Sequence, residues 1–287
     1  MSNYKIITDS GCDLSAEMLQ RLNVDSVSLS VLFQGQVRPD SVDAGIKEFY
    51  DGLRGGEVAT TSAVNPDGWS SVIENAFKAG QDVLILAFSS GLSTTYQSAV
   101  IAANELMEQY PARKAYVVDT LGASLGEGLM VYYACRKRDE GMALEDLRDW
   151  MENNKQNFCH WFTVDDLMFL KRGGRISATT ALVGTMLQIK PVLHVDSEGH
   201  LISVAKARGR KAAIDALAKK VAELGEGFDK DAMFISHGDC AEDAQHLASV
   251  LKEKFGVKYV HIGYVGAVIG SHAGPGVLAL FFLGKHR

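Results

Sequence analysis

The sequence predicts an α/β protein with two α/β domains. The N-terminal domain is expected to hold a doubly wound parallel sheet, and the C-terminal domain a mixed sheet with helices on both faces. Two observations predict this class. Apolar runs of strand length alternate with helical patterns through the first half of the chain, which is the order of a doubly wound domain. In the second half, strands are joined both by helices and by a β-hairpin, which requires a mixed sheet.

The clearest strand, turn and helix unit spans residues 83–107. Val83 to Phe88 is apolar without alternation, as in a parallel strand that is covered on both faces. A helical pattern follows, with apolar residues three and four positions apart. Between them lies the hydroxyl-rich turn Ser89 to Thr95. The first N–H groups of a helix lack internal partners and carry the positive end of its dipole, so this turn is a candidate site for a phosphate or carboxylate. An ordinary N-cap remains the alternative.

The other elements of the first half follow from the same patterns. Strands are expected at Tyr4 to Thr8, Val27 to Phe33 and Ala115 to Val118, and helices at Ala16 to Leu22, Ser41 to Leu53, Asp67 to Ala79, Glu127 to Arg138 and Leu144 to Asn153. A second hydroxyl cluster, Ala59 to Pro66, is expected to be irregular. Its likeness to the turn around Ser93 suggests that it forms a second wall of the same site.

A polar stretch at residues 153–157 predicts the domain junction, which divides the chain into residues 1–156 and 157–287. In the second domain, strands are expected at Phe158 to Val164, Pro191 to Asp196, Leu201 to Ala205, Met233 to Ser236, Tyr259 to Tyr264 and, closing the chain, Val277 to Leu283. Helices are expected at Asp165 to Leu170, Ile176 to Gln188, Lys211 to Leu224 and Ala241 to Phe255. Val268 to Gly276 is expected to be a glycine-rich turn region.

Composition limits the class of protein. The chain has 287 residues, 47% of them hydrophobic and 22% charged, as in a globular protein, and its net charge of −6 argues against general nucleic-acid binding. Four widely spaced cysteines indicate free thiols in a reducing compartment. We expect no signal peptide, and no apolar run reaches the roughly 18 residues of a membrane span. A cytoplasmic protein without stable membrane insertion is therefore expected.

Two enzymatic alternatives stay open. Gly122 to Gly126 matches the nucleophile elbow of α/β-hydrolases, with Ser124 as nucleophile and with Asp239 and His272 later in the required order. However, the preceding strand is expected to end near Asp119, too early for a sharp strand-to-serine turn. A sugar or glycerone phosphotransferase is suggested only by the anion sites at helix N-termini. The sequence contains no P-loop and no histidine spacing typical of metal ligands.

Three further features point to a site. His272 lies in the segment Gly270 to Gly276, whose glycines allow a close backbone approach to a ligand. The basic turn Lys171 to Arg175 can place a guanidinium beside a carboxylate. A second basic cluster, Lys206 to Lys211, can dock an acidic partner.

Together these segments resemble the DegV family of bacterial fatty-acid-binding proteins, almost from end to end. The resemblance is carried by Ile7-Thr8-Asp9-Ser10, Thr61-Ser62, the run Ser89 to Ala99, Leu170-Lys171-Arg172-Gly173-Gly174-Arg175-Ile176, Lys190-Pro191 and the run Gly270 to Gly276. In place of the Gln-Pro that often follows Thr-Ser in the family, this chain has Ala63-Val64-Asn65-Pro66.

The resemblance implies a carrier without catalysis or cofactor of its own, which holds one long-chain fatty acid such as palmitate between its two halves. It implies that Thr61 and Ser93 bind the carboxylate, that His272 and Arg175 complete the polar network, and that Ser62 and Thr94 belong to the same site. It further implies presentation of the acid to a fatty acid kinase, with Arg208 in kinase docking. Residues that would line an acyl tunnel are Met168, Phe169, Leu182, Met186, Leu187, Leu280 and Phe282.

Overall fold

The computed structural model describes residues 4–176, 189–225 and 231–287. Its strands are β1 (Tyr4–Asp9), β2 (Val24–Val27), β3 (Ser30–Phe33), β4 (Gln36–Pro39), β5 (Thr60–Ser62), β6 (Asp82–Ala87), β7 (Ala115–Asp119), β8 (Phe158–Thr163), β9 (Ile189–Val195), β10 (Leu201–Arg208), β11 (Ala232–His237), β12 (Tyr259–Tyr264) and β13 (Leu278–Leu283). Its helices are α1 (Ala16–Arg21), α2 (Ile46–Arg54), α3 (Pro66–Lys78), α4 (Thr95–Gln109), α5 (Leu125–Asp139), α6 (Leu144–Asn154), α7 (Leu167–Arg172), α9 (Arg210–Leu224), α10 (Ala241–Phe255), α11 (Ala267–Ala273) and the short 3-10 turns η1 (Ser10–Cys12) and η2 (Lys155–Asn157).

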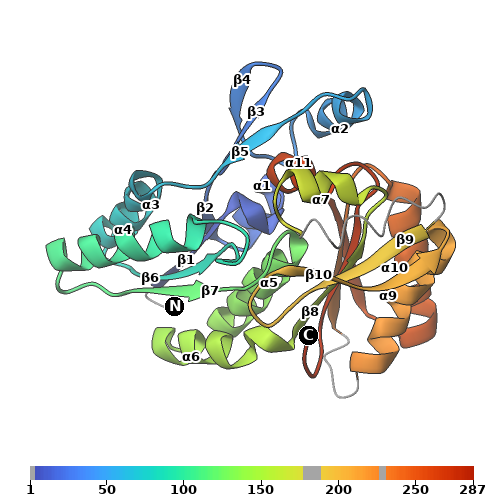
Figure 1. Ribbon diagram of the computed structural model, residues 1–287. Helices are drawn as coiled ribbons and strands as arrows, with labels where there is room; N and C mark the ends of the chain where they lie inside the picture. The colour runs from blue at the N-terminus through green and yellow to red at the C-terminus, as the bar shows by residue number, and fades with distance from the viewer. Residues whose placement is uncertain (1–3, 177–188, 226–230) are drawn as a thin grey trace.

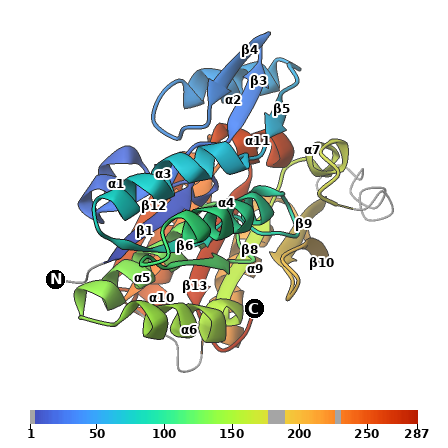
Figure 2. The same ribbon diagram turned by 90° about the vertical axis from the view of Figure 1, so that its left-hand side faces the viewer.

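The strands form two large sheets and a small one (Figure 1). Sheet A is parallel, in the order β2-β1-β6-β7. Sheet C is mixed, in the order β10-β9-β8-β13-β11-β12, and only its β11–β12 pair is parallel among the described strands. Sheet B, in the order β4-β3-β5, is antiparallel and projects from the rest of the molecule together with α2 (Figures 1 and 2).

Sheet A is covered by helices on both faces. Successive residues of a strand point to opposite sides, so each strand contributes side chains to both layers of helices. Ile6 and Leu84 pack toward α5 and α6, whereas Ile7 and Ile85 pack toward α3 and α4. All four side chains are fully buried. This arrangement explains why the central strand β6 has a continuous apolar run.

Helix α5 lies between sheets A and C, and it packs against strands of both. Most of its residues are buried, so it has no polar face of the kind that a surface helix shows. Its glycines permit this close packing: a methyl group added at Gly128 would lie 2.6 Å from the carbonyl oxygen of Cys12. The opposite face of sheet C is covered by α9 and α10.

The structure confirms the predicted fold class, a parallel doubly wound sheet and a mixed sheet with helices. The predicted boundary between residues 156 and 157 stays a prediction, since one apolar core continues through α5 from sheet A to sheet C. The helix expected over Ile176 to Gln188 falls outside the described residues, apart from Ile176. In the part of the chain that the structure describes, no helix has the length and apolarity that crossing a membrane requires.

Three local predictions were wrong. The strand expected over Val27 to Phe33 is two strands, because the chain leaves sheet A after Val27 and enters sheet B at Ser30. The segment Ala59 to Pro66, expected to be irregular, contains β5, which is too short and too polar to give a strand pattern. The expected turn region Val268 to Gly276 contains most of α11. Two carboxylates that are distant in sequence accept hydrogen bonds from the start of this helix: Gly266 N–H donates to Asp13 and Val268 N–H donates to Asp40. The last strand, β13, pairs with β8 and β11 in the interior of sheet C.

Candidate ligand-binding site

The structure contains a cavity of about 450 Å³ between sheet C and the loops that follow β5 and β6. Its described wall is mostly apolar, with polar groups gathered at a few points. The apolar lining is Leu29, Ala63, Phe88, Leu92, Ala123, Phe162, Leu170, Val195, Leu201, Val265, Val268, Ile269, Ala273, Val277, Ala279 and Phe281. The polar lining is Thr61, Ser62, Ser90, Ser93, Thr94, Gln97, Ser124, His160, Arg175, Ser236 and His272.

Thr95 joins the two hydroxyl-rich segments that the sequence places far apart. Its hydroxyl oxygen accepts from Val64 N–H at 3.4 Å and lies 2.8 Å from the hydroxyl oxygen of Ser93. The indole N–H of Trp69 donates to the Thr95 carbonyl at 3.2 Å. These bonds hold the Thr61 and Ser93 loops side by side at the cavity.

Thr61 and His272 form the second polar contact of the site. Thr61 Oγ1 lies 2.8 Å from Nε2 of His272, so β5 of sheet B meets α11 across the cavity wall. The imidazole also abuts the basic turn, because a methyl group at Gly173 would lie 2.1 Å from its Nδ1. This close approach requires glycine at position 173. The Nδ1 atom is buried and has no hydrogen-bond partner among the described residues.

Arg175 supplies the positive charge of the site. Its Nε and one terminal nitrogen donate to the Leu92 carbonyl at 3.2 and 3.1 Å, and its other terminal nitrogen donates to the Gly173 carbonyl. The first two bonds fix the turn after α7 against the loop after β6. A guanidinium has five N–H donors, so some remain for a ligand.

The electrostatics of the cavity favour a single anionic group. Burial, and secondarily the charge of Arg175, lowers the pKa of His272 from 6.5 to about 4, so this imidazole is neutral at pH 7. Among the described residues that line the cavity, none is acidic and Arg175 alone carries a fixed charge. An anion at the Arg175 end would therefore be neutralised, whereas an anion elsewhere in the cavity would be buried without a counter-charge.

All six residues predicted for the ligand site line this one cavity: Thr61, Ser62, Ser93, Thr94, Arg175 and His272. Their roles toward a ligand stay predictions. Arg208 lies elsewhere, exposed at the end of β10.

The predicted tunnel lining was partly wrong. Leu280 and Phe282 point to the α9 and α10 face of sheet C, and their neighbours Ala279 and Phe281 line the cavity. Of the two predicted α7 residues, Met168 is 37% exposed and Phe169 packs on Gly274. The expected contributions of Leu182, Met186 and Leu187 lie outside the described residues. Alternation along the strands puts Phe162 on one face of β8 and Ala279 and Phe281 on one face of β13, but both strands are buried on both faces, so the sequence does not show which face borders the cavity.

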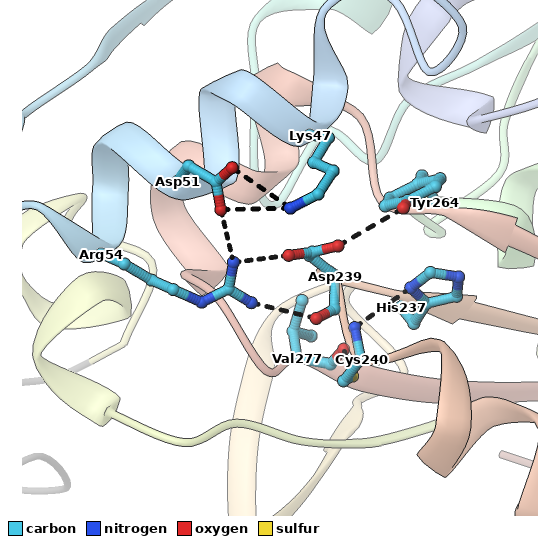
Figure 3. A network of polar contacts seen from close by, with 8 residues as sticks. All are labelled: Lys47, Asp51, Arg54, His237, Asp239, Cys240, Tyr264 and Val277. Atoms are coloured by element: carbon cyan, nitrogen blue, oxygen red, sulfur yellow. Dashed lines mark hydrogen bonds and ion pairs between the residues drawn. The ribbon is translucent and has the colours of Figure 1, made fainter.

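The hydrolase triad is not assembled. The Ser124 hydroxyl hydrogen-bonds with Asp13 and lies 2.9 Å from the Ser236 hydroxyl oxygen, whereas His272 pairs with Thr61. Asp239 binds Arg54 of α2 through its side chain and its carbonyl, at 2.5 and 2.9 Å (Figure 3). The three side chains therefore have separate partners, and no charge relay joins them.

A mostly apolar cavity between sheet C and the loops that follow β5 and β6, with Arg175 as the one fixed charge of its described lining, defines an α/β protein built around a binding cavity. The chain belongs to the DegV family: the family model described as "Uncharacterised protein, DegV family" matches residues 3–285. A DegV domain-containing protein of Clostridium perfringens is 43% identical, over 100% of this chain and 99% of that protein.

Solved structures agree with this assignment. A DegV family protein from Thermus thermophilus, whose structure is described as fatty acid binding, is 33% identical with a TM-score of 0.89, over 99% of this chain and 100% of that one. The Streptococcus pneumoniae fatty acid kinase B3 protein, loaded with linoleic acid, shares the fold at 23% identity and a TM-score of 0.85, over 99% and 100% of the two chains.

Proposed function

We propose that this protein binds one long-chain fatty acid, with the carboxylate at the Thr61 and Ser93 loops and the acyl chain along the apolar wall of the cavity. One observation carries the proposal: the cavity is apolar over most of its described wall, and the one fixed charge among the described lining residues is the positive Arg175 at one end. A long apolar chain with a terminal anion matches this distribution. The mostly apolar wall counts against a phosphosugar, which would need polar partners along its length.

The polar end provides the groups that a carboxylate requires. The hydroxyls of Thr61 and Ser93 can donate to its oxygens, and Arg175 supplies the counter-charge, which makes these hydrogen bonds charge-assisted. With the proton of the neutral imidazole on Nε2, His272 donates to Thr61 Oγ1 at 2.8 Å, which leaves the hydroxyl hydrogen of Thr61 available for the carboxylate. Ser62 and Thr94, both exposed at the rim of the cavity, would contact the ligand from outside.

The apolar wall supplies most of the affinity. Each buried methylene stabilises the complex by about 0.8 kcal/mol, so a chain of palmitate length gains enough to bind tightly without further polar contacts. The polar end then needs only to neutralise and orient the carboxylate. The Thermus thermophilus relative, described as fatty acid binding, supports this interpretation.

We further propose that the protein works in the cytoplasm of a bacterium as the non-catalytic partner of a fatty acid kinase. Arg208 is exposed at the end of β10, an edge strand of sheet C, and Ile202 and Val204 near the start of the same strand are 37% and 48% exposed. An exposed strand with a cationic end suits a partner with an acidic surface. An Arg208→Glu substitution is expected to reduce phosphorylation of the bound acid by the kinase without changing its binding. Lys254→Glu, the same charge reversal at an exposed residue in the last turn of α10 and outside the basic cluster, is the control.

Mass spectrometry of organic extracts from the purified protein tests fatty acid binding. We expect a long-chain fatty acid at about one mole per mole of protein, and its loss from a Thr61→Ala/Ser93→Ala double variant. Extracts without fatty acid, together with no binding of added fatty acid by the delipidated protein, would overturn the proposal.

A further inference from the structure

A second polar point lies in the cavity, apart from the Thr61 and Ser93 hydroxyls. His160 of β8 lines the cavity and is 1% exposed, and neither of its ring nitrogens has a hydrogen-bond partner in the described part of the chain. A buried polar group without a partner costs free energy, and most buried polar groups in proteins are paired. The imidazole therefore indicates a partner that enters with the ligand.

The ring is fixed in place by its neighbours. A methyl group at Gly126 would lie 2.3 Å from both Nδ1 and Cε1 of His160, and one at Gly122 would lie 2.7 Å from Cε1. The ring of Phe281 stands edge-on to it, with centroids 5.3 Å apart. The imidazole is thus confined between the loop before α5, the first turn of α5 and β13, so it cannot turn toward solvent.

The imidazole is also neutral. Burial, and secondarily the charge of Arg287, lowers the pKa of His160 well below its ordinary value. A neutral imidazole has one N–H donor and one acceptor nitrogen. It can therefore bind a group that donates or accepts one hydrogen bond, and its neutrality makes it a poor partner for a second carboxylate.

His160 lies at the end of the cavity that is remote from His272. Strand β13 pairs its first residue, Leu278, with Thr163 of β8, and it pairs Phe281 with His160. Helix α11, which carries His272, precedes the Leu278 end of β13 in the chain; Figure 2 labels both elements. With a rise of about 3.3 Å per residue, His160 lies about 10 Å farther along β8 than Thr163. Phe162 and Ala279 line the cavity between the two ends.

We propose that His160 is a subsite for a hydroxyl group on the acyl chain, at a carbon well removed from the carboxylate. Long-chain hydroxy fatty acids are then ligands of this protein in addition to unsubstituted ones. The inference rests on the proposed fatty acid binding. A hydroxyl both donates and accepts, so it matches either ring nitrogen, whereas an unsubstituted chain leaves both without a partner.

Ser236 provides a matched control in the same wall. It is fully buried and lines the cavity, but its hydroxyl oxygen already lies 2.9 Å from that of Ser124, which also hydrogen-bonds with Asp13. Because these groups satisfy one another, they do not need a partner from the ligand. A Ser236→Ala variant should therefore leave ligand preference unchanged.

A competition experiment tests the subsite. Delipidated protein is incubated with equal amounts of octadecanoic acid and of its derivatives hydroxylated at the second, tenth, twelfth or seventeenth carbon, and the bound acids are measured by mass spectrometry. His160→Leu is expected to lower the ratio of bound mid-chain or distal hydroxy acid to octadecanoic acid by about tenfold. His160→Gln, which keeps a donor and an acceptor, should retain the ratio within about threefold. The ratio for the isomer hydroxylated at the second carbon should not change.

Unchanged ratios in His160→Leu would overturn the inference. They would mean that the imidazole of the wild type gains no more from a hydroxyl on the ligand than from water. The inference would also be overturned if the preference for hydroxy acids over octadecanoic acid were lost in Ser236→Ala and kept in His160→Leu. If no acid binds to the wild type, the proposed function itself fails. Should His160→Leu not fold, ring nitrogen chemical shifts of His160 in the wild type decide: a shift difference between hydroxy and unsubstituted complexes is expected, and identical shifts refute the subsite.

Discussion

Removal of the Thr61 hydroxyl tests the polar end of the cavity with the smallest change in shape. Valine has the same branched form as threonine, and it suits β5 as a strand residue. The substitution removes one donor to the ligand carboxylate and the 2.8 Å contact with His272. A hydrogen bond to a charged group contributes about 1.5 to 3 kcal/mol, so the Kd for a long-chain fatty acid should rise about 10- to 150-fold.

Thr60→Val is the matched control for Thr61→Val. Thr60 precedes Thr61 on β5, so its side chain points to the opposite face of the strand, and it is exposed and does not line the cavity. Isothermal titration of delipidated protein with palmitate at neutral pH measures both variants. Equal affinities in Thr61→Val and Thr60→Val would refute the assignment of Thr61 to the carboxylate.

Three other predictions concern the pH dependence of stability, the packing around His160 and the ion pair between α2 and Asp239. The pKa of His272 is about 4 in the folded protein and 6.5 when unfolded, so the contribution of this neutral imidazole to the free energy of unfolding is complete above pH 6.5 and is lost as the pH falls toward 4. Over this range the wild type should lose up to about 3 kcal/mol more stability than His272→Gln. Equal losses in chemical denaturation would contradict this. Gly126→Ala, whose methyl group would lie 2.3 Å from the His160 ring, should lower the free energy of unfolding by about 1 to 3 kcal/mol, and an unchanged denaturation midpoint would show that the ring moves aside. Arg54→Gln breaks the ion pair with Asp239 (Figure 3), but since Arg54 is 41% exposed, the cost should stay below about 1 kcal/mol; a larger loss of thermal stability would mean that this pair holds α2 in place.

Patterns with a regular period predicted most of the fold. The buried strand at Val83 to Phe88 and the helix after Thr95 gave strong signals, because both faces of sheet A are covered and α4 has one apolar side. Sheet B left no comparable signal. Its strand β5 has only three residues, all hydroxyl-bearing, and β4 is exposed throughout, so pairing with β3 alone defines them as strands.

The candidate site was predictable where single residues carry distinctive chemistry. The hydroxyl clusters and a histidine among glycines indicated two loops and His272, and the family resemblance singled out Thr61 and Ser93 within those loops; all three residues line one cavity. The contact of Thr95 with Val64 was not predictable, because it depends on the tertiary approach of two loops. His160 was also missed: a histidine within an apolar strand gives no sign of which face it occupies until the pairing of β8 with β13 is known.

A crystal structure of the protein with palmitate is the decisive experiment. We expect the carboxylate within hydrogen-bonding distance of the Thr61 and Ser93 hydroxyls, and an acyl chain that runs past Phe162 toward His160. A carboxylate bound at the His160 end, or a cavity closed by side chains with palmitate absent, would contradict it.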